Sequence, residues 1–185
     1  MNFTPGEFRH RYTLAEYEHM ARVGAFDGKR TELLGGDIRV MTAMGSHHFL
    51  MVLHLNAEFF RALDGQAYVA CQLPLNLDDG SQPQPDFMIL RQNFQRKTIP
   101  QPQEVVCVVE VSDSTLCYDQ TAKLKFYASS NILEYWIVDV ERVTLEIYRE
   151  PKGNEYLFKH VLQKGHSASL LEFPDTLLEW WGFDA

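Results

Sequence analysis

The stretch VVCVVEV, residues 105–111, decides the fold. Apart from Glu110 it is an unbroken apolar run, which is typical of a central β-strand buried on both faces. A carboxylate in such a strand is costly unless it is paired or binds a metal. Glu110 is therefore the first candidate for a functional residue.

Downstream of this strand, the pattern predicts a helix over 119–129 and a strand over 134–139. A helix between two apolar strands is the usual crossover of a parallel strand pair. Asp119, Lys123 and Tyr127 recur at i, i+4 and i+8, so all three share one helix face, whereas Lys125 falls on another. The crossover can therefore bring Lys123 back beside Glu110.

Upstream, Asp86 follows Pro85 directly and opens a short apolar strand over 86–90. A preceding strand is predicted over 68–77, and a turn at 78–80 joins the two. An ionisable residue at the start of an apolar strand is unusual, so Asp86 is the second candidate.

The remaining elements are read from capping and turn signals. Thr13 and Glu16 form a capping box for a helix over 13–23, and a tight turn at Gly35 predicts a hairpin over 31–41. A second long helix is expected over 48–63, and further strands over 143–148 and 156–162. We predict one domain over 1–185, an α/β or α+β fold with a mixed central β-sheet flanked by helices.

Composition places the chain among ordinary globular proteins, with 45 % hydrophobic and 23 % charged residues over 185 positions. No apolar run approaches the roughly 20 residues that span a bilayer, and no secretory signal is evident, so we expect no membrane association. The chain has three cysteines, an odd number that does not suit a framework of paired disulfides. Unpaired cysteines favour a reducing compartment, so we expect a cytoplasmic location.

The formal net charge of −8 argues against a surface built for non-specific binding to nucleic acid. Positive contacts could still be local. The candidate cations for such contacts are Arg91, Arg96 and Lys97, or Lys123 and Lys125.

Two carboxylates and one lysine suit metal-assisted hydrolysis of a phosphodiester. Mg²⁺ prefers oxygen ligands, usually one or two protein carboxylates with water and substrate phosphate completing its shell. A nearby lysine can position the attacking water or stabilise developing negative charge. Asp86, Glu110 and Lys123 meet this requirement if the fold brings them together.

The order of motifs resembles the Uma-two family of restriction endonucleases, within the PD-(D/E)XK nuclease superfamily. The similarity runs from about Leu14 to about Phe173. It is carried by the runs at 31–38, 110–112, 118–119, 127–128 and 134–139, by Pro85-Asp86 and Lys123, and by His48 at the start of a helix.

This resemblance implies a restriction-endonuclease-like fold and a Mg²⁺-dependent DNA endonuclease, with Mn²⁺ as a substitute. It implies Asp86 and Glu110 as metal ligands, Lys123 as the catalytic lysine, and Glu32 as a further acid at the metal site or attacking water. A homodimer is expected, because two related sites most simply cut two strands.

One departure from the superfamily pattern leaves alternatives open. The lysine expected two residues after Glu110 is replaced by Ser112, and Lys123 on the following helix stands in for it. If Lys123 does not reach the site, the chain is a catalytically inactive nuclease-fold module that binds a protein or nucleic-acid partner. A hydrolase of other phosphoesters would use the same residues. His48 is interpreted chiefly as a helix-start residue.

Overall fold

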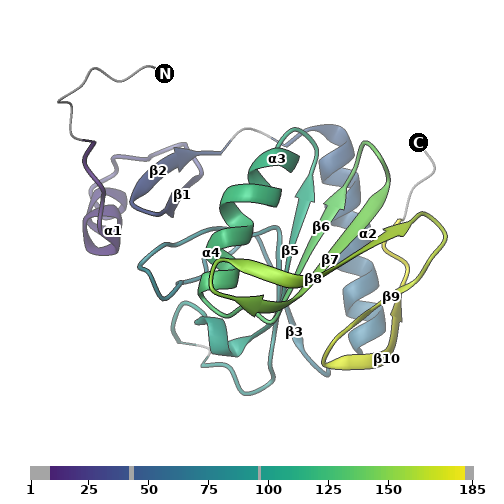
Figure 1. The fold of residues 1–185 in the computed structure, drawn as a ribbon. Helices are drawn as coiled ribbons and strands as arrows, with labels where there is room; N and C mark the ends of the chain where they lie inside the picture. The colour runs from purple at the N-terminus through teal and green to yellow at the C-terminus, as the bar shows by residue number, and fades with distance from the viewer. Residues whose placement is uncertain (1–8, 42–43, 96, 182–185) are drawn as a thin grey trace.

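A mixed β-sheet of six strands, in the order β3-β4-β5-β6-β7-β8, forms the centre of the computed structural model (Figure 1). The structure describes residues 9–41, 44–95 and 97–181. The strands of this sheet are β3 (Tyr68–Cys71), β4 (Phe87–Leu90), β5 (Val105–Ser112), β6 (Glu134–Asp139), β7 (Thr144–Lys152) and β8 (Glu155–Gln163).

The predicted crossover is confirmed, because β5 and β6 pair in parallel with Glu110 opposite Ile137. The other neighbours in this sheet are antiparallel. All eight residues of β5 are buried, as expected of a strand covered on both faces. The chain between the two strands forms α3 (Leu116–Tyr118), a π-helical turn (Asp119–Lys123) and α4 (Leu124–Ser129).

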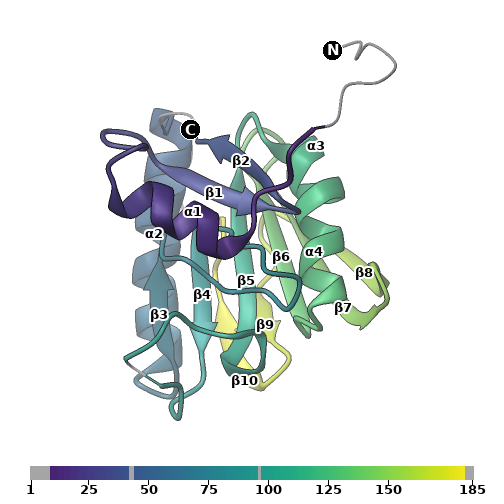
Figure 2. The ribbon, with the colours of Figure 1, turned by 90° about the vertical axis from the view of Figure 1, so that its left-hand side faces the viewer.

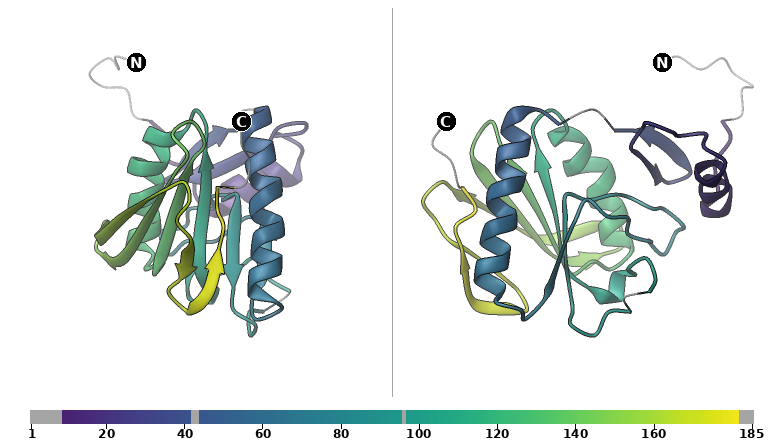
Figure 3. Two further views of the ribbon diagram at one scale, coloured as in Figure 1. Left: turned by 90° about the vertical axis from the view of Figure 1, so that its right-hand side faces the viewer. Right: turned by 180° about the vertical axis from the view of Figure 1, so that it is seen from behind.

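Helices cover the two faces of the sheet (Figure 3). On one face, α2 (Ser46–Leu63) packs Met51, Leu55 and Phe59 into a cluster with Trp136. The short strands β9 (Ala168–Leu170) and β10 (Phe173–Leu178) belong to the same side. On the other face, Tyr127 of α4 lies in a second buried cluster. The fold is therefore α+β, with its layers held by apolar side chains that alternate along the strands.

The N-terminal elements lie together on one side of the molecule, in front of the sheet in the view of Figure 2. Helix α1 (Leu14–Arg22) begins at Thr13, whose side chain and that of Glu16 form the predicted capping box. It is followed by the antiparallel hairpin β1 (Thr31–Leu34) and β2 (Asp37–Val40). An isolated bridge between Leu33 and Gln82 joins the hairpin to the rest of the chain.

Several expected boundaries were wrong. The strand predicted over 143–148 runs from Thr144 to Lys152. The strand predicted over 68–77 ends at Cys71, because Gln72 has a φ of 53° and breaks the extended ladder. The helix predicted from residue 119 begins at Leu116. The helix predicted from His48 begins at Ser46, with Gly45 as its N-cap.

Among the described residues, no helix is both long and apolar enough to cross a membrane.

Candidate active site

The four predicted site residues come together at one cavity of about 290 Å³. Glu32 lies on β1, Asp86 immediately before β4, Glu110 on β5, and Lys123 at the end of the π-helical turn. All four are buried, and each exposes 6 % or less of its surface. The fold thus gathers residues that are far apart in the sequence into a single ionisable cluster.

Lys123 reaches the cluster. Its Nζ atom lies 2.8 Å from Oε1 of Glu110 and 3.6 Å from Oε2 of Glu32. A third carboxylate, Asp119, is 3.9 Å away. Burial alone would lower the pKa of Lys123, but these three carboxylates outweigh burial and raise it. Lys123 therefore stays protonated and can act as a hydrogen-bond donor and a positive charge.

π-bulges within helices often occur at functional sites. The π-helical turn of this chain likewise lies at the candidate site. Asp119 opens the turn and is held by hydroxyl donors, with Ser112 Oγ at 2.7 Å and Thr115 Oγ1 at 2.6 Å. The side chains of Asp119, Lys123 and Tyr127 are all buried, as their predicted common face requires, whereas Lys125 is exposed.

Glu110 is held by two donors that share one oxygen. Lys123 Nζ and Tyr127 OH both lie 2.8 Å from Oε1. Burial in the central strand raises the pKa of Glu110 to about 8, although Lys123 opposes this shift. The charges of Asp119 and Asp86 add to the effect of burial, so the carboxyl of Glu110 is protonated near neutral pH in the metal-free protein.

Asp86 remains ionised more easily than Glu110. Burial would raise its pKa, but a hydrogen bond and the charge of His48, the Val111 N–H and the charge of Lys123 together lower it. His48 Nε2 lies 3.0 Å from Oδ1, and the Val111 N–H donates to Oδ2 at 2.9 Å. Asp86 is thus an anion held in a fixed orientation, whereas the carboxyl of Glu110 ionises only at a higher pH.

Glu32 lies on the hairpin side of the cavity. The Gln84 backbone N–H donates to its Oε2 at 3.4 Å, and Tyr118 OH to its Oε1 at 3.4 Å. The side chain of Gln84 also donates to the Thr31 carbonyl at 2.9 Å. The segment that leads into β4 therefore fixes the strand that carries Glu32.

The arrangement can hold a divalent cation with few protein ligands. In the described part of the chain, no three His, Cys, Asp or Glu side chains form a potential metal-binding group. Mg²⁺ does not need three, because it commonly uses one or two carboxylates and keeps several waters. Asp86 and Glu110 fit this donor set, since both are buried carboxylates that line one cavity.

The predicted basic contacts are only partly found here. Lys123 lines the cavity, but Arg91 pairs with Glu172 and donates to the Val105 carbonyl, at the far end of β5 from Glu110. Lys97 and Lys125 are exposed and do not line the cavity. Arg96 lies outside the described residues.

Comparison with models of protein families shows to which family the chain belongs. The model of the Uma2 (Uma-two) family, described as "Putative restriction endonuclease", matches residues 14–179. The chain belongs to the Uma2 family. A nuclease role is supported by this membership, and the resemblance expected from the motifs is confirmed.

A solved structure agrees with the fold of this Uma2 chain. It is described as a "putative nuclease belonging to DUF820" from Anabaena variabilis. The two share 13 % identity with a TM-score of 0.69, over 91 % of this chain and 94 % of the other. At this identity the similarity shows the fold alone. No curated protein matches the chain significantly.

Several residues of this Uma2 site were not predicted from the sequence. His48 was interpreted as a helix-start residue, yet it bonds Asp86. The sequence feature that could have indicated this role is the resemblance to the family, which includes His48 at the start of a helix. Gln84 and Tyr118, which contact Glu32, carried no spacing signal, because their partner lies on a distant part of the chain.

Proposed function

We propose that this Uma2-family chain is a Mg²⁺-dependent DNA endonuclease that hydrolyses phosphodiester bonds. The observation that carries the proposal is the 2.8 Å contact between Lys123 Nζ and Glu110 Oε1 inside a cavity shared with Asp86. The inactive-module alternative depended on Lys123 failing to reach the site. The contact therefore favours the enzyme.

Asp86 and Glu110 would hold the cation. When bound, Mg²⁺ supplies Lewis-acid polarisation of a phosphoryl oxygen and a more acidic water. His48 and the Val111 N–H keep Asp86 oriented, and Tyr127 keeps Glu110 oriented. A metal ligand restrained by a second hydrogen bond binds more tightly than a free one.

Lys123 would act on the charge that develops on the phosphoryl oxygens. Its raised pKa makes it a poor general base and a persistent donor. We assign contact with the attacking water to Glu32, which lines the cavity 3.6 Å from Lys123 Nζ. Asp119 also lines the cavity, at 3.9 Å, but it already accepts hydrogen bonds from Ser112 and Thr115.

The test is cleavage of supercoiled plasmid DNA by the purified chain with Mg²⁺ or Mn²⁺. Asp86→Ala and Lys123→Ala should each lower cleavage by at least about 100-fold, because each removes a group acting on the reacting phosphate. Lys125→Ala is the matched control, since Lys125 is an exposed lysine on α4. Full activity in both site variants would contradict the assignment.

Metal binding separates the enzyme from a binding module. Calorimetry should detect Mn²⁺ binding that Glu110→Gln weakens strongly. Wild-type protein that binds DNA but neither Mg²⁺ nor Mn²⁺ would favour the inactive module.

We also propose a homodimer working in the cytoplasm. Two related sites would cut both strands of a duplex, and the three cysteines of the chain are free thiols. Analytical ultracentrifugation of the chain with a duplex should give the mass of two chains per DNA. A monomer that makes only single-strand nicks would contradict the dimer and leave the nuclease assignment intact.

A further inference from the structure

One cation at the cavity is left without a partner by the contacts described so far. Arg30 directly precedes β1 and lines the same cavity as Asp86 and Glu110. Its Nη2 atom is buried and has no hydrogen-bond partner among the described residues. A buried donor without a partner destabilises the folded protein, and more so when it is charged. Arg30 therefore places a positive charge beside the cavity, and no carboxylate of the described residues forms an ion pair with it.

The carboxylates of the site do not satisfy this donor. Asp86 accepts from Gln72 and Val111 and contacts His48. Glu32 and Glu110 contact Lys123. An anion that enters the cavity is the partner that the charge of Arg30 favours. A planar guanidinium recognises the paired oxygens of a phosphate better than an ammonium does.

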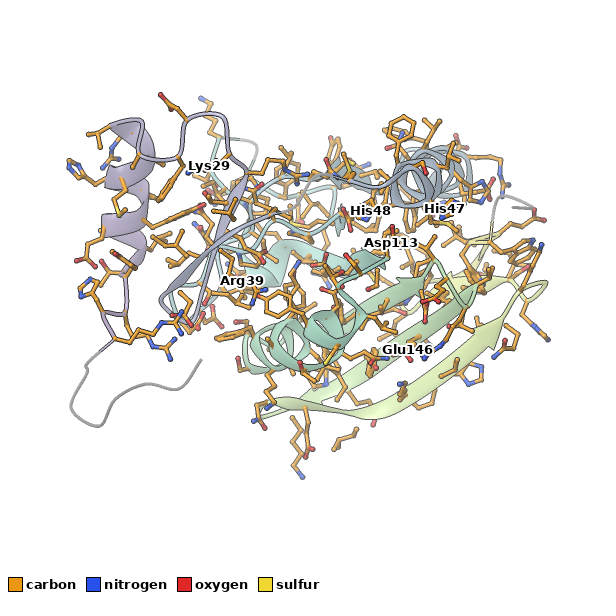
Figure 4. The ribbon with its side chains drawn as sticks, turned by 90° about the horizontal axis from the view of Figure 1, so that it is seen from above. Lys29, Arg39, His47, His48, Asp113 and Glu146 are labelled. Atoms are coloured by element: carbon orange, nitrogen blue, oxygen red, sulfur yellow. The ribbon has the colours of Figure 1, made fainter. Side chains whose placement is uncertain are left out.

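A second arginine lies on the other arm of the hairpin. Arg39 is opposite Glu32 in the β1–β2 register and lines the same cavity. Its guanidinium carbon lies 3.7 Å from the centre of the Tyr118 ring, so the ring restrains the plane of the cation. No ion pair of Arg39 is found within the described ranges. Figure 4 shows Arg39 on the hairpin side, across from His48 and Asp113.

We infer that Arg30 and Arg39 bind phosphates of the nucleic-acid backbone and seat it over the carboxylate cluster. The inference rests on the proposed nuclease function and names its substrate-positioning residues. Arg30 contacts a phosphate inside the cavity, and Arg39 contacts a phosphate at the rim. This pair gives a chain of net charge −8 a local positive contact where DNA must enter.

The experiment measures binding separately from cleavage. Fluorescence anisotropy with a fluorescein-labelled duplex in EDTA gives Kd over a range of salt concentrations. Arg30→Gln and Arg39→Gln should each weaken binding about tenfold or more, and each should reduce the slope of log K against log salt by about 1. Lys29→Gln is the matched control, because it removes the same charge from the adjacent position, which does not line this cavity.

Thermal melting distinguishes substrate binding from a structural role for Arg30. Removing a buried unpaired charge should leave the Tm of the free protein unchanged or raise it. Arg30→Lys should recover part of the binding, because it restores the charge without the planar fork. A lowered Tm with unchanged Kd would overturn the inference.

The two proposals fail differently. If wild-type protein cleaves DNA and both arginine variants keep its Kd, KM and salt slope, the inference is wrong and the nuclease assignment stands. If wild-type protein binds the duplex but cleaves it with neither Mg²⁺ nor Mn²⁺, the nuclease assignment fails, and the salt slopes still test the arginines. Wild-type protein that binds neither duplex nor single-stranded DNA overturns both.

Discussion

Glu110 combines a cost to folding with a clear chemical use. Its carboxyl lies on a buried strand whose neighbouring residues are apolar, and among the described residues it accepts hydrogen bonds from Lys123 and Tyr127. The pKa of Glu110, raised from 4.5 to about 8, means that the folded chain binds more protons than the unfolded chain between these values. The free energy of unfolding therefore falls as pH rises through this range.

We predict that Glu110→Gln removes this loss of stability with rising pH. Without metal, the wild-type Tm should fall between pH 6 and pH 8.5 by several degrees more than that of the variant, since 1 kcal/mol corresponds to about 2–4 °C in a chain of this size. Glu155→Gln, at an exposed position, is the control for a simple change of charge. Differential scanning calorimetry in EDTA measures the effect, and parallel pH profiles for the three proteins would contradict it.

Added Mg²⁺ should restore the stability that the wild-type protein loses at high pH. A cation that binds ionised Glu110 stabilises the folded chain by RT ln(1 + c/Kd), where c is the concentration of free Mg²⁺. The recovery at pH 8.5 should be absent in Glu110→Gln. Equal recovery in both proteins would place the cation elsewhere.

The sequence could predict the residues whose neighbours in the chain make them unusual. Glu110 stood out within an apolar strand, and Lys123 shared a helix face with Asp119 and Tyr127. Arg30 and His48 could not be assigned in this way, because their surroundings come from distant segments. An arginine before a hairpin and a histidine at a helix start are ordinary until the fold places them at the cavity.

At the scale of elements, the crossover between β5 and β6 positions Lys123, and the hairpin positions Glu32. The helix of the crossover was predictable from its spacing. Its π-helical turn was not, because residues at i and i+4 share a face in either helix type. The hairpin turn was predictable from Gly35 and Gly36, which both adopt positive φ.

We predict that Gly35→Ala lowers DNA cleavage more than it lowers stability. Gly35 has a φ of 57°, and an added Cβ would lie 2.6 Å from Cζ of Phe126 on α4. Either the Phe126 ring or the hairpin must move, and we expect the hairpin to move and to displace Glu32 with it. Gly153→Ala is the matched control, because its φ is 63° and nothing lies within 4 Å of an added Cβ. Both should lose about 1 kcal/mol or more from backbone strain, but only Gly35→Ala should lose most of its cleavage activity.

Across the whole molecule, the mixed sheet was predictable because the longest apolar run and the next strand are separated by one helix. The length of the strand after Tyr68 was not, since Gln72 turns the chain by its backbone conformation and not by its residue type. The prediction of a single domain over 1–185 remains a prediction.

The joining of the N-terminal hairpin to the sheet has a consequence for how the molecule opens. Backbone hydrogen bonds link Leu33 with Gln82, and neither Leu33 nor Leu34 belongs to the two main clusters of core side chains. Small cooperative units whose side chains lie outside the main core open before the core does. Amide hydrogen exchange should therefore be faster in β1 and β2 than in β5.

A low concentration of urea should then separate opening of the hairpin from unfolding of the sheet. Cleavage should be lost first, as the hairpin carries Glu32 and both arginines away, while fluorescence from Trp136 and Trp180 in the main core stays native. Coincident midpoints would show that hairpin and sheet unfold as one unit. If the hairpin does open alone, the nuclease has a reversible inactive state that costs far less than global unfolding, and bound DNA would close it.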